Sequence, residues 1–222
     1  MKADFSNEDK IKCLLWSNRH CCLCGKACGT DIEIAHIIPR GRQRSWDIDN
    51  AIPLCYDCHA EIGRYNRAHP RGNKYRPEEL KARRDQIYEE QTRHLVPPIQ
   101  FEVTQQIVGT NTRREFPDVG YNIAHLGDSL PVRVRVIARM FLDNKDLGIH
   151  QSEDYSGKKI WNLNPRFAVY GHFKVPVEKV EKHQRLEIKV TAIIIDRYER
   201  EHELLPMGWV YSPDANAWIY SP

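Results

Sequence analysis

Four cysteines have the spacing that one metal ion requires. Two residues separate Cys21 from Cys24, and two separate Cys55 from Cys58. This spacing lets one turn present two sulfurs to one ion, and two such turns complete a tetrahedral set of thiolates. All four positions around the metal are then filled by protein, so the site is structural. The sequence therefore predicts a structural zinc ion.

The other cysteines leave alternatives open. Cys22 or Cys28 could replace a ligand, although a knuckle usually has the form Cys-x2-Cys-Gly, as at residues 21–25. All seven cysteines precede residue 59, and the polar first residues 1–9 do not resemble a secretory signal. An odd number of cysteines in such a chain argues against a disulfide framework. The rival interpretations are buried cysteines without metal and a spare zinc ligand at His59.

Three polar residues, His36, Asn50 and His59, are of types that suit phosphodiester hydrolysis. An imidazole with a near-neutral pKa can take a proton from water. Taken singly, His36 would be an ordinary core histidine and Asn50 a turn residue. They are 14 and 9 residues apart and lie among the two cysteine pairs, an order that matches the family described next.

On these residues, the sequence resembles an HNH nuclease of the ββα-metal type, in its zinc-stapled branch, over roughly residues 13–92. The resemblance implies that His36 takes the proton from water, and that Asn50 bonds the backbone near His36 and so holds the imidazole in position. It implies that His59 binds Mg²⁺ or another divalent ion. The expected substrate is double-stranded DNA, cut with little sequence preference to leave 5′-phosphate and 3′-hydroxyl ends.

A narrower resemblance covers residues 66–84, which look like the HNH domains of bacterial phage-defence and restriction proteins. It implies an antiviral or restriction role in the bacterial cytoplasm. One position departs from the family pattern, because Ala35 stands where members carry Asp or His as a second metal ligand. Glu33 lies two residues earlier on the same strand face, so we expect it to replace that ligand. The rivals are water at this position and a weakly active domain.

Basic residues near these positions are candidates for contact with DNA phosphates, which carry no sequence information. A solvated surface charge is the alternative for each of them. The candidates are Arg40, Arg42, Arg44, Arg64, Arg67 and Lys74.

The elements that must position the site are predicted from periodicity and end signals. Ser6 begins a helix that ends near Asn18, with Ile11, Leu14 and Leu15 on one face. Short strands are expected at 32–38 and 51–54, with a helix over 56–67. A further helix opens at Pro77 and runs to about residue 93. Pro97 and Pro98 end the first domain, which spans residues 1–98.

The second domain, residues 99–222, resembles no family recognised from its residues. Apolar and polar residues alternate over 131–142, and the segments 186–195 and 207–211 are also strand-like. The overall prediction is an α+β protein: a ββα-metal domain with flanking helices, followed by an antiparallel β-sandwich-like domain. By analogy, the second domain binds an activating ligand, a partner protein or another copy of the chain.

Composition narrows the class of protein. The chain has 222 residues, 41% hydrophobic and 28% charged, which suits a globular protein without membrane spans. Its net charge of +3 lies in residues 1–100, with 17 basic and 14 acidic side chains. Two alternatives to the nuclease remain. One is a nucleic-acid-binding module that has lost metal binding because Ala35 replaces a ligand. The other is an enzyme that is inactive until an activator binds.

Overall fold

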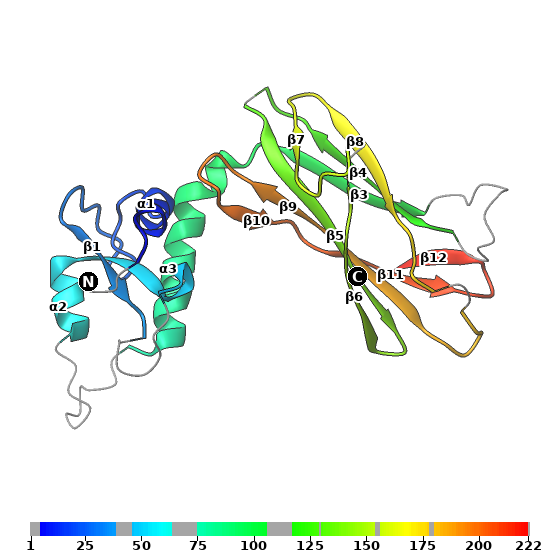
Figure 1. Cartoon of the computed structure of the whole chain (residues 1–222), viewed down its shortest axis with the longest axis horizontal. Helices are drawn as coiled ribbons and strands as arrows, with labels where there is room; N and C mark the ends of the chain where they lie inside the picture. The colour runs from blue at the N-terminus through cyan, green and yellow to red at the C-terminus, as the bar shows by residue number, and fades with distance from the viewer. Residues whose placement is uncertain are drawn as a thin grey trace. The chain divides into compact units, whose positions relative to one another are not determined.

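The computed structural model describes residues 5–38, 46–63, 75–105, 117–128, 130–153, 156–177 and 180–221. The chain divides into two compact units, which Figure 1 colours from blue to red along the sequence. The first unit comprises residues 1–94 together with 198–200, and the second comprises 95–197 and 201–222. The sequence placed the boundary after residue 98 and did not anticipate the 198–200 segment.

The first unit begins with helix α1, Asn7–Trp16. As expected, Ser6 caps it: its hydroxyl accepts a hydrogen bond from the Asp9 amide at 3.0 Å. The predicted apolar face is wrong in detail, because Ile11 is 57% exposed and Leu15 is 39% exposed. Cys13 is the buried residue of this helix instead.

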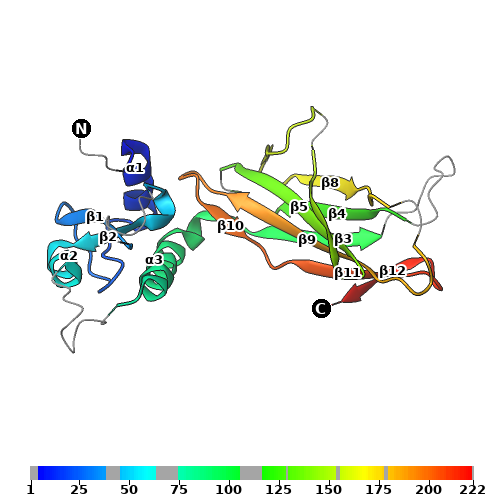
Figure 2. The same ribbon diagram turned by 60° about the horizontal axis from the view of Figure 1, so that its bottom comes forward.

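A β-hairpin and a helix follow. Strands β1, Ile32–His36, and β2, Ala51–Cys55, pair antiparallel, and the short 3₁₀ turn η1, Ile48–Asn50, leads into β2. Helix α2, Tyr56–Gly63, begins directly after β2. Figures 1 and 2 show α2 on one side of the hairpin, with α1 and α3 on the other. This is the predicted ββα arrangement with flanking helices.

Helix α3, Pro77–Thr92, has Pro at its start, as expected, and the 3₁₀ turn η2, Arg93–Leu95, follows it. Its buried residues recur every fourth position: Leu80, Arg84, Tyr88 and Thr92. That spacing forms one face of a helix. The 198–200 segment belongs to this unit through Arg200, which donates to the Thr92 hydroxyl at 2.6 Å and pairs with Glu89 at 3.1 Å.

The second unit is an antiparallel sandwich of two sheets. The larger sheet has the order β12-β11-β9-β5-β6, with β10 on β9 and β7 on β5, and the smaller has the order β3-β4-β8. The strands of the smaller sheet are β3, Ile99–Gln105; β4, Val119–His125; and β8, Ala168–Phe173. Those of the larger are β5, Val132–Leu142; β6, Lys145–Gln151; β7, Trp161–Leu163; β9, Leu186–Ile195; β10, Glu201–Glu203; β11, Met207–Ser212; and β12, Ala217–Ser221.

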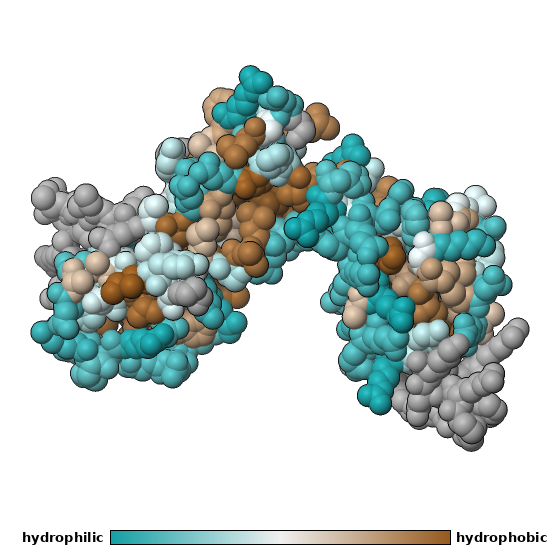
Figure 3. All heavy atoms as spheres, turned by 180° about the vertical axis from the view of Figure 1, so that it is seen from behind, coloured by the Kyte–Doolittle hydropathy of each residue, from teal (hydrophilic) through white to brown (hydrophobic). Residues whose placement is uncertain are grey.

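One apolar core joins the two sheets. It includes Val119, Tyr121 and Ile123 from β4 with alternate residues of β5 and β9, such as Val134 and Ile188. The period-2 alternation predicted for 131–142 is confirmed, since Val132, Val134, Val136, Ala138 and Met140 are all buried. On the face seen in Figure 3, apolar residues of this unit form brown areas bordered by hydrophilic ones.

Two arginines of β5 form ion pairs with acidic residues of β10 and β6. Arg135 pairs with Glu201 at 2.7 Å, and Arg139 pairs with Asp146 at 2.6 Å. Tyr211 and Trp218 are buried in the core, as expected of sandwich aromatics. None of the described helices is both long and apolar enough to cross a bilayer.

Candidate functional site

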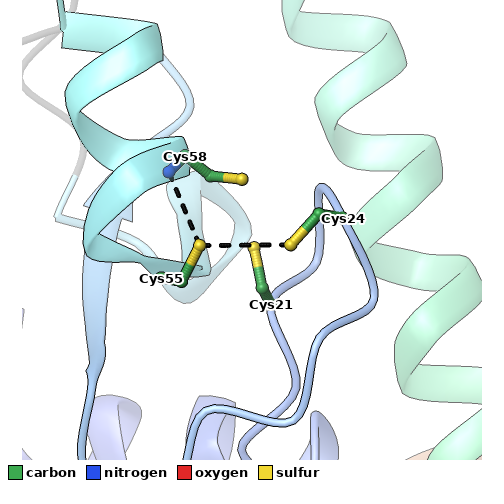
Figure 4. Close-up of side chains that lie close together, drawn as sticks. All are labelled: Cys21, Cys24, Cys55 and Cys58. Atoms are coloured by element: carbon green, nitrogen blue, oxygen red, sulfur yellow. Dashed lines mark hydrogen bonds between the residues drawn. The ribbon is translucent and has the colours of Figure 1, made fainter.

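The four predicted cysteine ligands converge. The Sγ atoms of Cys21, Cys24, Cys55 and Cys58 all lie within 4.8 Å of one another, and those of Cys24 and Cys55 are 4.0 Å apart. Figure 4 shows the four side chains pointing toward one another, two from the loop after α1 and two from the junction of β2 with α2. Zinc bound at about 2.3 Å to four sulfurs needs separations near 3.8 Å. The donor set therefore fits a structural zinc ion, and all the cysteines are free thiols rather than disulfides.

The pKa shifts of the clustered thiols are consistent with a bound cation. Burial, the largest cause, raises the pKa of the Cys24 and Cys58 thiols, and hydrogen bonds among the clustered thiols contribute at Cys58. Burial also acts to raise the pKa of Cys21, but backbone hydrogen bonds at Cys24 and Cys55 bring it below its usual value. Clustered thiolates repel one another, so a bound cation is what lets them ionise together.

The structure also decides between the alternative cysteine ligands. Among the described residues, only Cys21, Cys24, Cys55 and Cys58 form such a group. Cys22 is buried in the apolar cluster beside them, and the Cys28 thiol is 3.1 Å from the Lys26 carbonyl oxygen. The clustered set contains the preferred pair, Cys21 and Cys24, and neither Cys22 nor Cys28.

Glu33 and His59 lie in direct contact. Glu33 is on β1 and His59 on the first turn of α2, and the carboxylate Oε2 is 2.5 Å from the imidazole Nδ1. Both side chains are a little under half exposed. One carboxylate and one imidazole at a partly open position form a donor pair that could hold a divalent ion, with water completing its coordination. Ala35 is buried on the same strand and offers no ligand atom.

Asn50 fixes the backbone that follows His36. The amide is 4% exposed; its Oδ1 accepts from the Ile38 N–H at 2.8 Å, and its Nδ2 donates to the Ile38 carbonyl at 3.2 Å. The Ile37 N–H donates to the Asn50 carbonyl at 2.9 Å. These bonds lock the chain as it leaves β1. They are the kind of backbone clamp that the resemblance implied for this residue.

His36 is held between aromatic rings. Its imidazole stacks on Phe5 with ring centroids 4.3 Å apart, and Trp46 meets it edge-on at 5.2 Å. Successive strand residues point to opposite faces, so His36 lies on the face opposite Glu33. Ile34, on the same face as His36, packs in the cluster that contains Phe5. Phe5 and Trp46 were not predicted, and no spacing in the sequence ties them to His36.

Arg84 is a positioning residue whose role the sequence did not reveal. It lies on the buried face of α3, and its guanidinium donates to the Asp49 carbonyl at 2.7 Å and to the Ala51 carbonyl at 3.3 Å. These carbonyls flank Asn50, so Arg84 holds the turn that carries the amide clamp. An arginine within an i, i+4 stripe of buried positions is the signal that could have found it.

The predicted nucleic-acid contacts lie outside the described residues. They are Arg40, Arg42, Arg44, Arg64, Arg67 and Lys74.

Comparison with known proteins supports the first unit's assignment. Residues 21–64 match the family model for HNH endonucleases. This matched segment contains both cysteine pairs, His36, Asn50 and His59. The predicted resemblance to a zinc-stapled HNH domain is thereby confirmed for this segment. A search of the curated proteins found no match. A solved structure titled "X-ray structure of Northeast Structural Genomics Consortium target SoR45" is 12% identical, covering 52% of this chain and 88% of that one, with a TM-score of 0.36.

Proposed function

We propose that the first unit is a metal-dependent endonuclease that hydrolyses phosphodiester bonds of double-stranded DNA with little sequence preference. An HNH segment makes it a nuclease or a nucleic-acid-binding module. The observation that carries the catalytic choice is the contact of Glu33 with His59, because it supplies two metal-type donors at the position where Ala35 supplies none.

Each residue then has a separate task. His36, oriented by Phe5 and Trp46, takes the proton from the attacking water. Asn50 holds the backbone beside His36, and Arg84 holds Asn50. Glu33 and His59 would bind the divalent ion, which supplies charge stabilisation at the phosphate and the leaving oxygen. The cysteine cluster keeps β2 and α2 in place, and with them His59.

The proposed setting is a bacterial phage-defence or restriction pathway in the cytoplasm, with the second unit regulating, recognising or assembling. This rests on the narrower sequence resemblance of residues 66–84 and on analogy.

Plasmid incubation with Mg²⁺ or Mn²⁺ tests the catalytic proposal. Wild-type protein should convert supercoiled DNA to nicked and linear forms, and His36→Ala should lower the rate by about 100-fold or more, as expected for loss of a general base. His94→Ala is the matched control, since this exposed histidine lies outside the site. Equal cleavage by His36→Ala and wild type would refute the assignment of the base.

The metal-ligand role of Glu33 has its own test. At limiting Mg²⁺, Glu33→Ala should cleave much more slowly than wild type, and added Mg²⁺ should restore part of the rate. Normal cleavage by this variant at limiting Mg²⁺ would rule out Glu33 as a ligand.

A second candidate is a zinc-stapled module that binds nucleic acid without cutting it. Two observations favour it: Ala35 removes a family ligand, and His36 lies on the opposite face of β1 from the Glu33–His59 pair. In that case, a gel-shift assay without divalent ions would show DNA binding by both wild type and His36→Ala. Neither protein would cleave DNA when Mg²⁺ or Mn²⁺ is added.

A further inference from the structure

The second unit contains a cavity of about 1010 Å³, and all of its described lining residues belong to that unit. It opens beside β5, where the hydrogen-bonded neighbour of that strand changes from β6 to β7. The segment between those two strands and the edge strand β8 of the smaller sheet supply most of the wall. The cavity is therefore a product of the sheet topology, with the size of a pocket for a whole small molecule.

The inner wall is built around one hydrogen bond between the two sheets. The Tyr121 hydroxyl on β4 is 2.6 Å from the Ser152 hydroxyl just beyond β6, and both residues are buried. A Cβ at Gly171, which faces Tyr121 across the β4–β8 ladder, would lie 2.3 Å from the Tyr121 oxygen. Glycine at that position is what lets the tyrosine reach across the cavity wall.

Two lining residues carry buried polar atoms whose hydrogen-bonding capacity is unused. Trp161 is only 7% exposed, and its indole Nε1 has no partner among the described residues. The Nε2 atom of His150 is likewise buried without a described partner. Buried donors and acceptors are normally satisfied, so these two atoms, in residues that line the cavity, are candidate partners for a ligand that displaces the groups covering them.

The charge of the lining favours an anion. Two lysines, Lys158 and Lys174, line the cavity, whereas Glu153 is the one acidic residue in the described lining. Aromatic and aliphatic groups, among them Trp161 and Phe173, supply apolar wall between the cations. Such a wall suits a flat ring, and the cations suit a phosphate or carboxylate.

We propose that this cavity binds a small organic anion that carries a planar ring, held by Lys158 and Lys174 and hydrogen-bonded by Trp161. The shared chemistry is a ring with a phosphate or carboxylate group. This proposal does not depend on the nuclease assignment, because every lining residue belongs to the second unit.

The test uses the full chain and the aromatic anion 8-anilinonaphthalene-1-sulfonate as a fluorescent probe. Wild-type protein should bind it with one-to-one stoichiometry, and the double variant Lys158→Ala/Lys174→Ala should bind at least about 10-fold more weakly. The control is Lys182→Ala/Lys189→Ala, which removes the same charge from exposed residues outside the lining. Equal weakening in both double variants, or none in the first, would overturn the proposal.

Competitors then identify the anionic group. Nucleoside 5′-monophosphates, benzoate and inorganic phosphate are each titrated against the bound probe. Displacement by either ring-bearing anion well below the concentration needed for inorganic phosphate supports the proposal and separates phosphate from carboxylate. Displacement by inorganic phosphate at the same concentration would leave no role for the ring and would refute it.

A spectroscopic readout examines the indole directly. The proton resonance of the Trp161 N–H, identified by its absence in Trp161→Phe, should shift during titration with the displacing competitor. The other indole resonances should stay in place. An unmoved Trp161 signal at saturation would show that the ligand lies elsewhere.

Discussion

The buried cores of the two units differ in size and in residue type. Of the 11 buried residues described in the main cluster of the first unit, three are zinc-ligand cysteines, and the rest come from turns, two short strands and one face of α3. The core of the second unit has 22 described buried residues, all of them apolar or aromatic and none of them cysteine. The smaller core of the first unit contributes little to its folding free energy, so the first unit depends on a bound metal for stability and the second does not.

The two units also differ in how exposed their polar side chains are. The cysteine cluster fixes β2 and α2 from one side, so polar residues such as Glu33 and His59 can stay half exposed. In the sandwich, two buried polar side chains, Asp196 and His202, pair with each other at 2.9 Å.

Removal of zinc should produce the largest difference in stability between the two units. Structural zinc contributes about 10–16 kcal/mol of apparent binding free energy in small domains, so chelation or Cys55→Ser should unfold the first unit. The sandwich should stay folded because none of its core residues is a ligand. Hydrogen–deuterium exchange followed by mass spectrometry measures protection in each unit separately.

Cys28→Ser is the matched control for the zinc prediction. Cys28 is half-buried and lies outside the ligand cluster, so its replacement should leave the protection of both units nearly unchanged. Loss of protection in β5 and β9 on chelation would show that the second unit also depends on the metal, contrary to the comparison.

The second largest effect is expected from Arg84→Ala. This change leaves the carbonyls of Asp49 and Ala51 without their buried donor and should lower the free energy of unfolding of the first unit by about 3 kcal/mol. The neighbouring Arg83→Ala removes an exposed pair with Glu79 and a long, 3.4 Å bond to the Leu23 carbonyl, and should cost less than about 1 kcal/mol. Denaturant unfolding of the zinc-loaded chain compares the two, and equal losses would remove Arg84 from its positioning role.

Local patterns predicted the elements well where periodicity and end signals agree. The strand at 186–195 has the expected bounds, the Ser6 cap begins α1, and the cysteine spacing gave the ligand cluster. Each of these depends on residues close in sequence, or on thiols that have few other uses in a reduced protein. The HNH resemblance adds the order of His36, Asn50 and His59, and the family match supports it.

Tertiary contacts account for what the sequence did not predict. Ile11 and Leu15 fit an apolar helix face, yet α1 turns Cys13 inward, because the partner surface decides which side is buried. Arg84 takes a core position because three backbone carbonyls at the entry to β2 need a donor. The stacking of Phe5 on His36 joins residues 31 positions apart, and no local rule encodes such a pair.

The smallest effect, on the second unit alone, concerns Tyr121. Burial raises the pKa of its hydroxyl above the usual 10.0, and the bond with Ser152 offsets that only in part. A pKa raised in the folded state means that this contribution to stability is intact below pH 10 and is lost as pH rises toward the folded-state pKa. Tyr121→Phe should cost about 1 kcal/mol at neutral pH, through the lost hydrogen bond, and should flatten the decline above pH 10. Unfolding of the sandwich across pH 8–11, followed by hydrogen exchange in β4 and β5, measures both effects. A variant whose stability falls as steeply as that of wild type above pH 10 would show that another group titrates there, and the Tyr121–Ser152 bond would then not be the alkaline weak point of the sandwich.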